Sequence, residues 1–108
     1  MKGDLRLMWI IVFFDLPVTK PKQRRSATQF RNFLLKDGYL MLQYSVYARV
    51  CKGQDAVGKH LKRAQAHLPS EGSIRALQVT DKQYSRMRIL LGNLTPEEQT
   101  GGEQLLFF

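Results

Sequence analysis

The sequence MWIIVFFD, which spans Met8–Asp15, decides the fold. Six consecutive residues, from Trp9 to Phe14, are apolar, and each of them is β-branched or aromatic. The run is too short to cross a bilayer. Its length and composition predict a strand that is buried on both faces and lies in the middle of a sheet.

An acidic residue, Asp15, ends this strand, and Pro17 follows two residues later. Because proline cannot donate a hydrogen bond to a sheet ladder, the strand is expected to end here. The carboxylate then lies where a buried strand reaches the surface, which is a common place for a functional group in α/β sheets. Position alone leaves two interpretations of Asp15 open: a functional carboxylate, or a residue that only caps a turn.

The chain has 108 residues, the length of one domain, and a formal net charge of +8 with a pI near 10. Such a basic protein is expected to bind a polyanion. A membrane surface is the competing partner, but neither a basic amphipathic helix with bulky apolar residues nor a lipidation signal stands out. We expect no signal peptide. The single cysteine, Cys51, suits a reducing cytoplasm and a packing role.

Apolar periodicity places the remaining elements along the chain. Helical spacing predicts two helices, and alternation predicts strands. The segment Tyr39–Val50 alternates over a length that suits either one long strand or two strands with a break near Gln43–Ser45. The expected elements after the first strand are a helix over 20–37, the strand or strands over 39–50, a helix over 55–68, a strand over 73–80, a helical turn over 81–87 and a short strand over 88–91.

This order of elements predicts an α+β fold, a ferredoxin-like βαββαβ sandwich in which two helices cover one face of the sheet. The other face needs a partner, and a second copy of the chain in a face-to-face homodimer is the simplest one. We expect residues 1–92 to form this domain and residues 93–108 to form a linker and an extra C-terminal strand. Four apolar residues near the end of the chain are expected to pack on the dimer partner: Leu105, Leu106, Phe107 and Phe108.

A basic run without acids is the clearest functional signal in the sequence. Between Leu16 and Lys36 there are six basic residues and no acidic one, whereas a merely solvated helix face normally mixes both signs. We therefore expect this run to bind nucleic acid, with a solvated surface as the alternative. The candidate nucleic-acid-binding residues are Lys20, Lys22, Arg24, Arg25 and Arg31.

The histidines and tyrosines carry weaker signals. His60 and His67 lie on one predicted helix, roughly 10 Å apart along its axis, which is too far to share a metal ion, so both are expected to pack. Tyr39, Tyr44 and Tyr47 suggest a base-stacking sheet, but the glycine–aromatic motif of RNA-recognition modules is absent and strand packing explains them.

Several segments of the chain together form the pattern of a known family. They are Phe14-Asp15-Leu16, Arg24-Arg25, then Phe30, Phe33, Leu34 and Gly38, then Gln43-Tyr44-Ser45-Val46-Tyr47, Thr80-Asp81-Lys82-Gln83-Tyr84, Ile89-Leu90-Leu91-Gly92 and the apolar tail. Over nearly its whole length the chain resembles the Cas-two family, the small CRISPR-associated proteins of spacer acquisition. It departs from the family in the loop Val18–Lys22, which carries an extra proline and lysines, and at Tyr47, where phenylalanine is frequent.

The resemblance implies a homodimer with its sheets face to face, in which two Asp15 carboxylates approach across the two-fold axis and hold Mg²⁺ or another divalent cation. Symmetry allows one such site per dimer. The resemblance also implies a complex in which this dimer bridges two dimers of the Cas-one integrase along a DNA duplex. Finally, it implies metal-dependent endonuclease activity on RNA or duplex DNA, with Asp15 as the catalytic and metal-binding residue.

The leading hypothesis is therefore a homodimeric, duplex-DNA-binding scaffold for CRISPR adaptation in a prokaryotic cytoplasm, with a metal-dependent nuclease site at Asp15. A free-standing endoribonuclease of the toxin type is the first alternative. A regulatory ferredoxin-like domain that binds no nucleic acid is the second. The sequence supplies the features of a scaffold more fully than those of a catalyst, because one Asp per chain is a small ligand set for Mg²⁺.

Deletion of residues 104–108 is expected to weaken the dimer. Burial of four apolar side chains against the partner contributes on the order of 6–10 kcal/mol before the cost of ordering the tail. The truncated protein should therefore dissociate at a higher concentration in sedimentation equilibrium and melt at a lower temperature. A truncation that leaves both measurements unchanged would contradict a role of the tail in the dimer.

Overall fold

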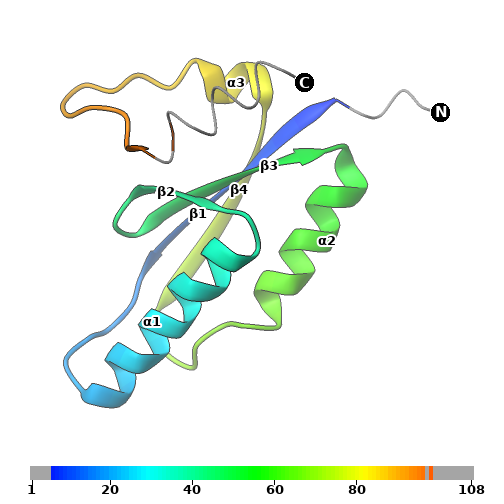
Figure 1. Ribbon diagram of the computed structural model, residues 1–108. Helices are drawn as coiled ribbons and strands as arrows, with labels where there is room; N and C mark the ends of the chain where they lie inside the picture. The colour runs from blue at the N-terminus through cyan, green and yellow to red at the C-terminus, as the bar shows by residue number, and fades with distance from the viewer. Residues whose placement is uncertain (1–5, 97, 99–108) are drawn as a thin grey trace.

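A computed structural model describes residues 6–96 and 98 of the chain (Figure 1). Seven helices and strands are defined within these residues. They are β1 (Leu7–Asp15), α1 (Pro21–Lys36), β2 (Leu40–Gln43), β3 (Val46–Lys52), α2 (Gln54–Gln65), β4 (Ser73–Thr80) and α3 (Asp81–Ser85). The strands form one antiparallel sheet in the order β2-β3-β1-β4, so β1 lies inside it as predicted. The order of elements and of strands confirms the ferredoxin-like α+β fold.

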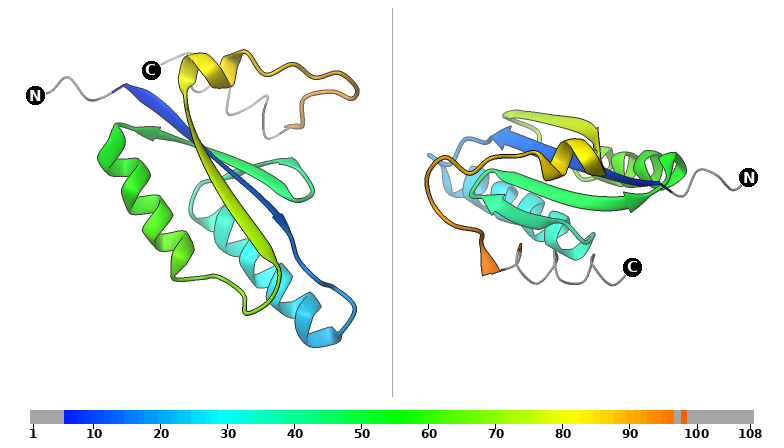
Figure 2. Two further views of the ribbon diagram at one scale, coloured as in Figure 1. Left: turned by 180° about the vertical axis from the view of Figure 1, so that it is seen from behind. Right: turned by 90° about the horizontal axis from the view of Figure 1, so that it is seen from above.

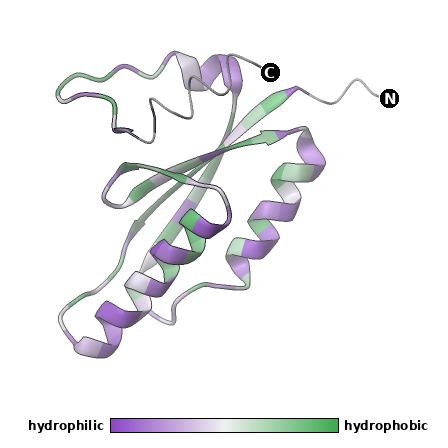
Figure 3. Cartoon of the chain, viewed as in Figure 1, coloured by the Kyte–Doolittle hydropathy of each residue, from purple (hydrophilic) through white to green (hydrophobic). Residues whose placement is uncertain are grey.

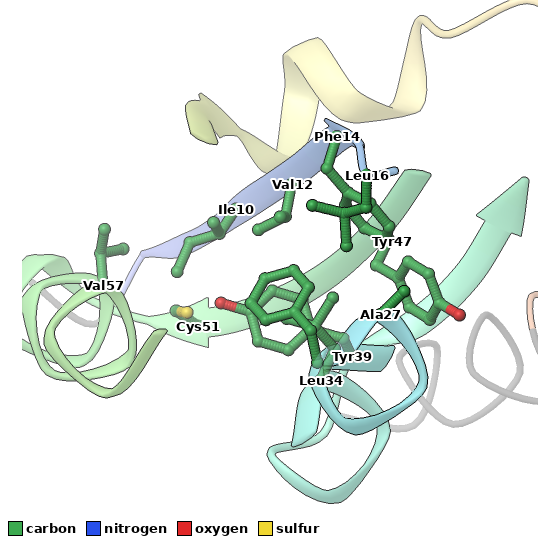
Figure 4. Close-up of a cluster of buried hydrophobic side chains, with 11 residues drawn as sticks. Ile10, Val12, Phe14, Leu16, Ala27, Leu34, Tyr39, Tyr47, Cys51 and Val57 are labelled. Carbon is green, nitrogen blue, oxygen red and sulfur yellow. The ribbon is translucent and has the colours of Figure 1, made fainter. Parts of the chain in front are cut away.

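The core lies between the sheet and the helices α1 and α2, which lie side by side on one face (Figures 1 and 2). Alternate residues of β1 point toward these helices, and three of them, Ile10, Val12 and Phe14, are buried. Figure 4 shows these side chains together with Cys51 of β3 and Leu34 of α1. The burial of Cys51 fits the packing role expected for the single thiol.

The opposite face of the sheet, here called the open face, carries the other residues of β1. Trp9 is buried there because its ring stacks on Tyr84 of α3, with ring centroids 3.8 Å apart. No such cover extends along the strand within the described residues, and Phe13 is 37% exposed. The prediction that β1 is buried on both faces is therefore wrong for its second half in the single chain. The register places the open face on Trp9, Ile11, Phe13, Val46, Ala48, Val50, Arg75, Leu77 and Val79.

Helix α1 forms because one stripe of its residues is apolar and the rest are polar, as the bands of colour in Figure 3 show. Pro21 stands at its first turn, where a missing backbone N–H costs nothing. The helix ends at Lys36 because Gly38 has φ +92°, a conformation that favours glycine, and a Cβ there would collide with the Arg49 guanidinium. The predicted helix over 20–37 is confirmed.

The alternating segment 39–50 is divided, as one of its two interpretations had it, into β2 and β3 by a turn at Tyr44 and Ser45. Two of its tyrosines, Tyr39 and Tyr47, are buried in the core. Tyr44 is 70% exposed, because it stands in the turn rather than on a strand face. The interpretation that strand packing explains all three tyrosines is therefore wrong for Tyr44.

Two other predicted elements differ from the structure. Helix α2 ends at Gln65 rather than at Leu68, because the N–H of Ala66 bonds the carbonyl of Arg63 and tightens the last turn ahead of Pro69. The predicted strand over 88–91 is absent from the described residues. After β4 the chain turns into α3, which Thr80 caps, and residues 86–91 pair with no strand. Further along, the Thr95 hydroxyl donates to the carbonyl of Met41 in the edge strand β2.

The predicted C-terminal strand, with Leu105, Leu106, Phe107 and Phe108, lies outside the described residues. Among the helices that the structure describes, none has the length and apolarity needed to cross a membrane.

A polar cluster joins the end of α1 to α2, and we call its three residues, Asp37, His60 and Arg63, the Asp37 latch. The side chains of Asp37 and His60 are buried, whereas that of Arg63 is 48% exposed. Nδ1 of His60 lies 2.8 Å from Oδ2 of Asp37, and Nη1 of Arg63 donates to Oδ1 over 2.7 Å. The Arg49 guanidinium also donates to the backbone carbonyl of Asp37. Both histidines pack as predicted, since His67 stacks on Phe33. The bond to Asp37 was not predicted, because the two partners are 23 residues apart.

Burial by itself would raise the pKa of Asp37. Hydrogen bonds from His60 and Arg63, together with the positive charge of these groups, outweigh burial and hold the pKa below its usual value. A carboxyl whose pKa is lowered by folding stabilises the fold above its unfolded pKa. That contribution is lost as the pH falls through the unfolded pKa, about 3.9, toward the folded one.

Replacement of the latch carboxylate, Asp37→Asn, is expected to lower the free energy of unfolding at pH 7 by about 1–3 kcal/mol. Between pH 5 and pH 2 the wild type should lose more stability than the variant, because only the wild type has this carboxylate to protonate. Urea denaturation across that range measures both effects. Glu71→Gln, which removes an exposed carboxyl, is the matched control and should follow the wild type; equal acid slopes for wild type and Asp37→Asn would contradict the assignment.

Candidate functional site

Asp15 lies exposed at the end of β1, where the sequence placed it. Its neighbour across the ladder is Ser73 of β4. Within the described part of the chain the Asp15 side chain forms no hydrogen bond or ion pair, so the turn-cap interpretation finds no support. The carboxylate instead borders a hollow of about 300 Å³, here called the Asp15 hollow, which is lined by Phe13, Phe14, Asp15, Ser45, Val46, Ser73 and Arg75.

Two strands, β1 and β4, and the β2–β3 turn position the polar groups of the Asp15 hollow. The backbone N–H of Phe14 donates to the carbonyl of Ser45 over 3.0 Å, which fixes the β2–β3 turn beside the end of β1. Arg75 stands opposite Phe13 in the β1–β4 register, so it shares a face with Asp15 and is its diagonal neighbour. The hollow therefore combines one carboxylate, one guanidinium and two hydroxyls.

The fit of this site to Mg²⁺ depends on the number of its ligands. Among the described residues no group of three or more His, Cys, Asp or Glu side chains could hold a metal ion. Mg²⁺ is, however, commonly held through one or two carboxylates, with water and substrate phosphate oxygens as the other ligands. Asp15 supplies one such carboxylate, and the serine hydroxyls beside it are oxygen donors. The donor set fits Mg²⁺ of this kind and does not form a closed all-protein cage.

The predicted basic residues fall into two groups. Lys22 and Arg25 are exposed and border a second hollow, of about 340 Å³, between the start of α1 and the α2–β4 connection. Lys20 is also exposed, directly before α1. These three residues present their charges to solvent at one end of the helix.

Arg24 and Arg31 instead form hydrogen bonds within the protein. Arg24 donates to the carbonyls of Val18 and Thr19 over 3.0 and 2.9 Å, and thereby holds the loop before α1. Arg31 lies at the β2–β3 turn, where its guanidinium stands 4.0 Å from the centroid of the Tyr44 ring. The structure thus brings Arg31, but not Lys22 or Arg25, to the residues around the Asp15 hollow.

The sequence did not identify Arg75, Ser45 or Ser73 as site residues. Arg75 and Ser73 reach the hollow through the β1–β4 register, and Ser45 reaches it through the β2–β3 turn. Neither relation follows from spacing along the chain. The only available signal was Ser45 within the segment Gln43–Tyr47, which carried the family resemblance.

Comparisons with known proteins bear on this site. The family model described as CRISPR associated protein Cas2 matches residues 8–87. A protein of Acidovorax ebreus named CRISPR-associated endoribonuclease Cas2 is 50% identical over 94% of this chain and 100% of its own length. Proteins of the same name from Flavobacterium psychrophilum and Paracidovorax avenae are each 41% identical, the first over 98% of this chain and 92% of its own length, the second over the full length of both.

Proposed function

The chain belongs to the Cas2 family of CRISPR-associated proteins, and from that premise we propose that it is a homodimeric scaffold that binds duplex DNA and acts with the Cas-one integrase in spacer acquisition. We further propose a metal-dependent nuclease site at Asp15. The family match confirms the family that the sequence resemblance indicated. The names of the relatives confirm the prediction of a nuclease at the level of the family.

The observation that carries the DNA-binding proposal is the exposed basic end of α1. Lys20, Lys22 and Arg25 are exposed there, and no acidic residue occurs between Leu16 and Lys36. Lysine and arginine side chains that point to solvent bind phosphates without reading base sequence. A duplex laid along this end would be held through its backbone, as a scaffold requires.

The open face supports the proposal of a homodimer. Phe13 and Leu77 are 37% and 52% exposed on it, and no element other than α3 covers it within the described residues. Exposed apolar surface of this kind marks an interaction site. A second copy that covers this face brings the two Asp15 carboxylates toward one axis and adds a second ligand for a divalent cation.

The Asp15 hollow supports the nuclease proposal through the roles its side chains can take. Asp15 would hold the cation, which when bound supplies a polarised water and neutralises charge on the phosphate. The Arg75 guanidinium can bind two phosphate oxygens at once through its parallel N–H groups. Ser45 and Ser73 can donate or accept a hydrogen bond and so orient a water or a phosphate oxygen.

A free-standing endoribonuclease is the second candidate function. The relatives are named endoribonucleases, and the Asp15 hollow carries no feature that selects DNA over RNA. This candidate needs the Asp15 site and not the basic end of α1, whereas the scaffold needs the basic end and not the site. Substitutions at each place separate the two functions.

Replacement of the two exposed cations, Lys22→Gln with Arg25→Gln, is expected to weaken duplex binding and to reduce the slope of log affinity against log salt by about 2 for each protomer that contacts the duplex. Fluorescence anisotropy at several salt concentrations measures both quantities. The matched control is Lys59→Gln with Lys62→Gln, which removes the same charge from the exposed side of α2. Equal losses in the two double variants would show a general charge effect and contradict a duplex site on α1.

Replacement of the site carboxylate, Asp15→Asn, is expected to reduce Mg²⁺-dependent cleavage by about 100-fold or more, because an amide is a poor ligand for Mg²⁺ and carries no charge. Duplex binding should stay within about twofold of the wild type, since its phosphate contacts lie on α1. The control Asp55→Asn removes an exposed acid elsewhere and should leave cleavage unchanged.

The same variant separates scaffold from enzyme when spacer acquisition is measured beside cleavage. Lost cleavage with retained acquisition supports a scaffold whose nuclease site is dispensable for acquisition. Loss of both, with the dimer intact, makes cleavage part of the process. Retained metal-dependent cleavage in Asp15→Asn contradicts the assignment of the site.

A further inference from the structure

Two opposite charges lie close together on the open face of the sheet, and neither is paired within the described residues. Asp15 ends β1, and Arg75 of β4 is its diagonal neighbour, so both side chains point to the same side of the sheet. Both residues are exposed, and both line the Asp15 hollow. The ion pairs found in the described part of the chain both belong to Asp37 instead.

The surroundings of these two charges are apolar. Phe13 and Val46 line the same hollow, and Leu77, which follows Arg75 by two residues in β4, is 52% exposed on the open face. When a second copy covers this face, the carboxylate and the guanidinium lose water together with the apolar side chains. A charge that leaves water without a partner of opposite sign strongly weakens an interface, so each of these two charges needs a partner.

Two-fold symmetry allows the two charges to satisfy each other. In an interface between identical surfaces, residue i of one copy contacts residue j of the other, and j contacts i in return. A contact between Asp15 of one copy and Arg75 of the other therefore occurs twice. The four charges then sum to zero, whereas two carboxylates that approached the axis alone would repel each other.

We propose that Arg75 reaches across the dimer interface and pairs with Asp15 of the second copy, so that the Asp15 site is assembled from both chains. The inference rests on the proposed homodimer and gives Arg75 a positioning role in it. Without metal, the guanidinium is the counter-charge of the carboxylate. When the carboxylates hold a divalent cation, the guanidinium is released from this pair and can bind a phosphate oxygen.

A mixed dimer of two variants tests the pairing in the full chain without divalent cations. Asp15→Asn and Arg75→Gln are placed in separate, differently tagged chains that are expressed together, and native mass spectrometry measures the three kinds of dimer. The mixed dimer keeps one carboxylate opposite one guanidinium, whereas each homodimer presents two like charges. The mixed dimer should make up about nine-tenths of all dimers, against about one half for random pairing.

The matched control mixes Asp55→Asn with Lys59→Gln, which removes the same two charges from exposed positions on α2. Because α2 covers the other face of the sheet, this pair should give the random mixture. A preference for the mixed dimer in the site pair alone supports the inference. Random pairing in both mixtures, or the same preference in both, overturns it and leaves the homodimer standing. If the wild type is a monomer, the proposed homodimer fails as well.

Sedimentation equilibrium of Arg75→Gln gives an independent measurement. Its dimer dissociation constant without metal should rise by about tenfold or more, because two carboxylates then face each other without a counter-charge. Addition of Asp15→Asn to the same chain should recover part of this loss, since no carboxylate is left to repel. A dissociation constant that equals that of the wild type would contradict the pair. Pairing of Asp15 with Arg75 of its own chain is the main alternative, and it predicts no preference for the mixed dimer.

Discussion

The pairing of β1 on both of its edges is the constraint on which the rest of the structure depends. Its ladders to β3 and β4 run almost its full length, so neither neighbour can slip without moving apolar side chains to the wrong face. The same ladders bring Ser73 and Arg75 to the end of the strand, where Asp15 emerges. The core strand β1 thus determines the geometry of the polar site at its end. The core does not depend on the polar residues of that site.

The composition of that site limits its chemistry. Because each chain offers one carboxylate there, the proposed cation site would need substrate phosphate or a second copy to complete its ligands. A nuclease of this kind would depend on its metal ligands, whereas a basic scaffold needs only charges that face solvent. The sequence therefore signals the scaffold more clearly than the enzyme, although the curated relatives carry the name of the enzyme.

The sequence predicted most of the fold because its signals were local. The apolar stripe of α1, the apolar members of β4 and the position of Gly38 after α1 are signals that depend on neighbours a few residues away, and both elements form where they were expected. The predicted strand over 88–91 is wrong because a strand forms only where the chain pairs with another strand, which composition does not reveal. Asp15 was found from its place at the end of a strand, but Arg75 was not, because its approach to Asp15 exists only in the β1–β4 register.

The basic run was predicted as one surface. In the structure it falls into residues whose N–H groups bond within the protein and residues whose charges face solvent. Arg31 donates to the β2–β3 turn and its guanidinium lies over the Tyr44 ring, whereas Lys22 is exposed to solvent. The two residues are nine positions apart on one helix, about 14 Å along its axis. A duplex bound at the start of α1, as proposed, would therefore use Lys22 and leave the contacts of Arg31 with the turn intact. The proposed duplex site at the start of α1 and the proposed nuclease site at the end of β1 thus rest on different residues, so a substitution can remove one and leave the other.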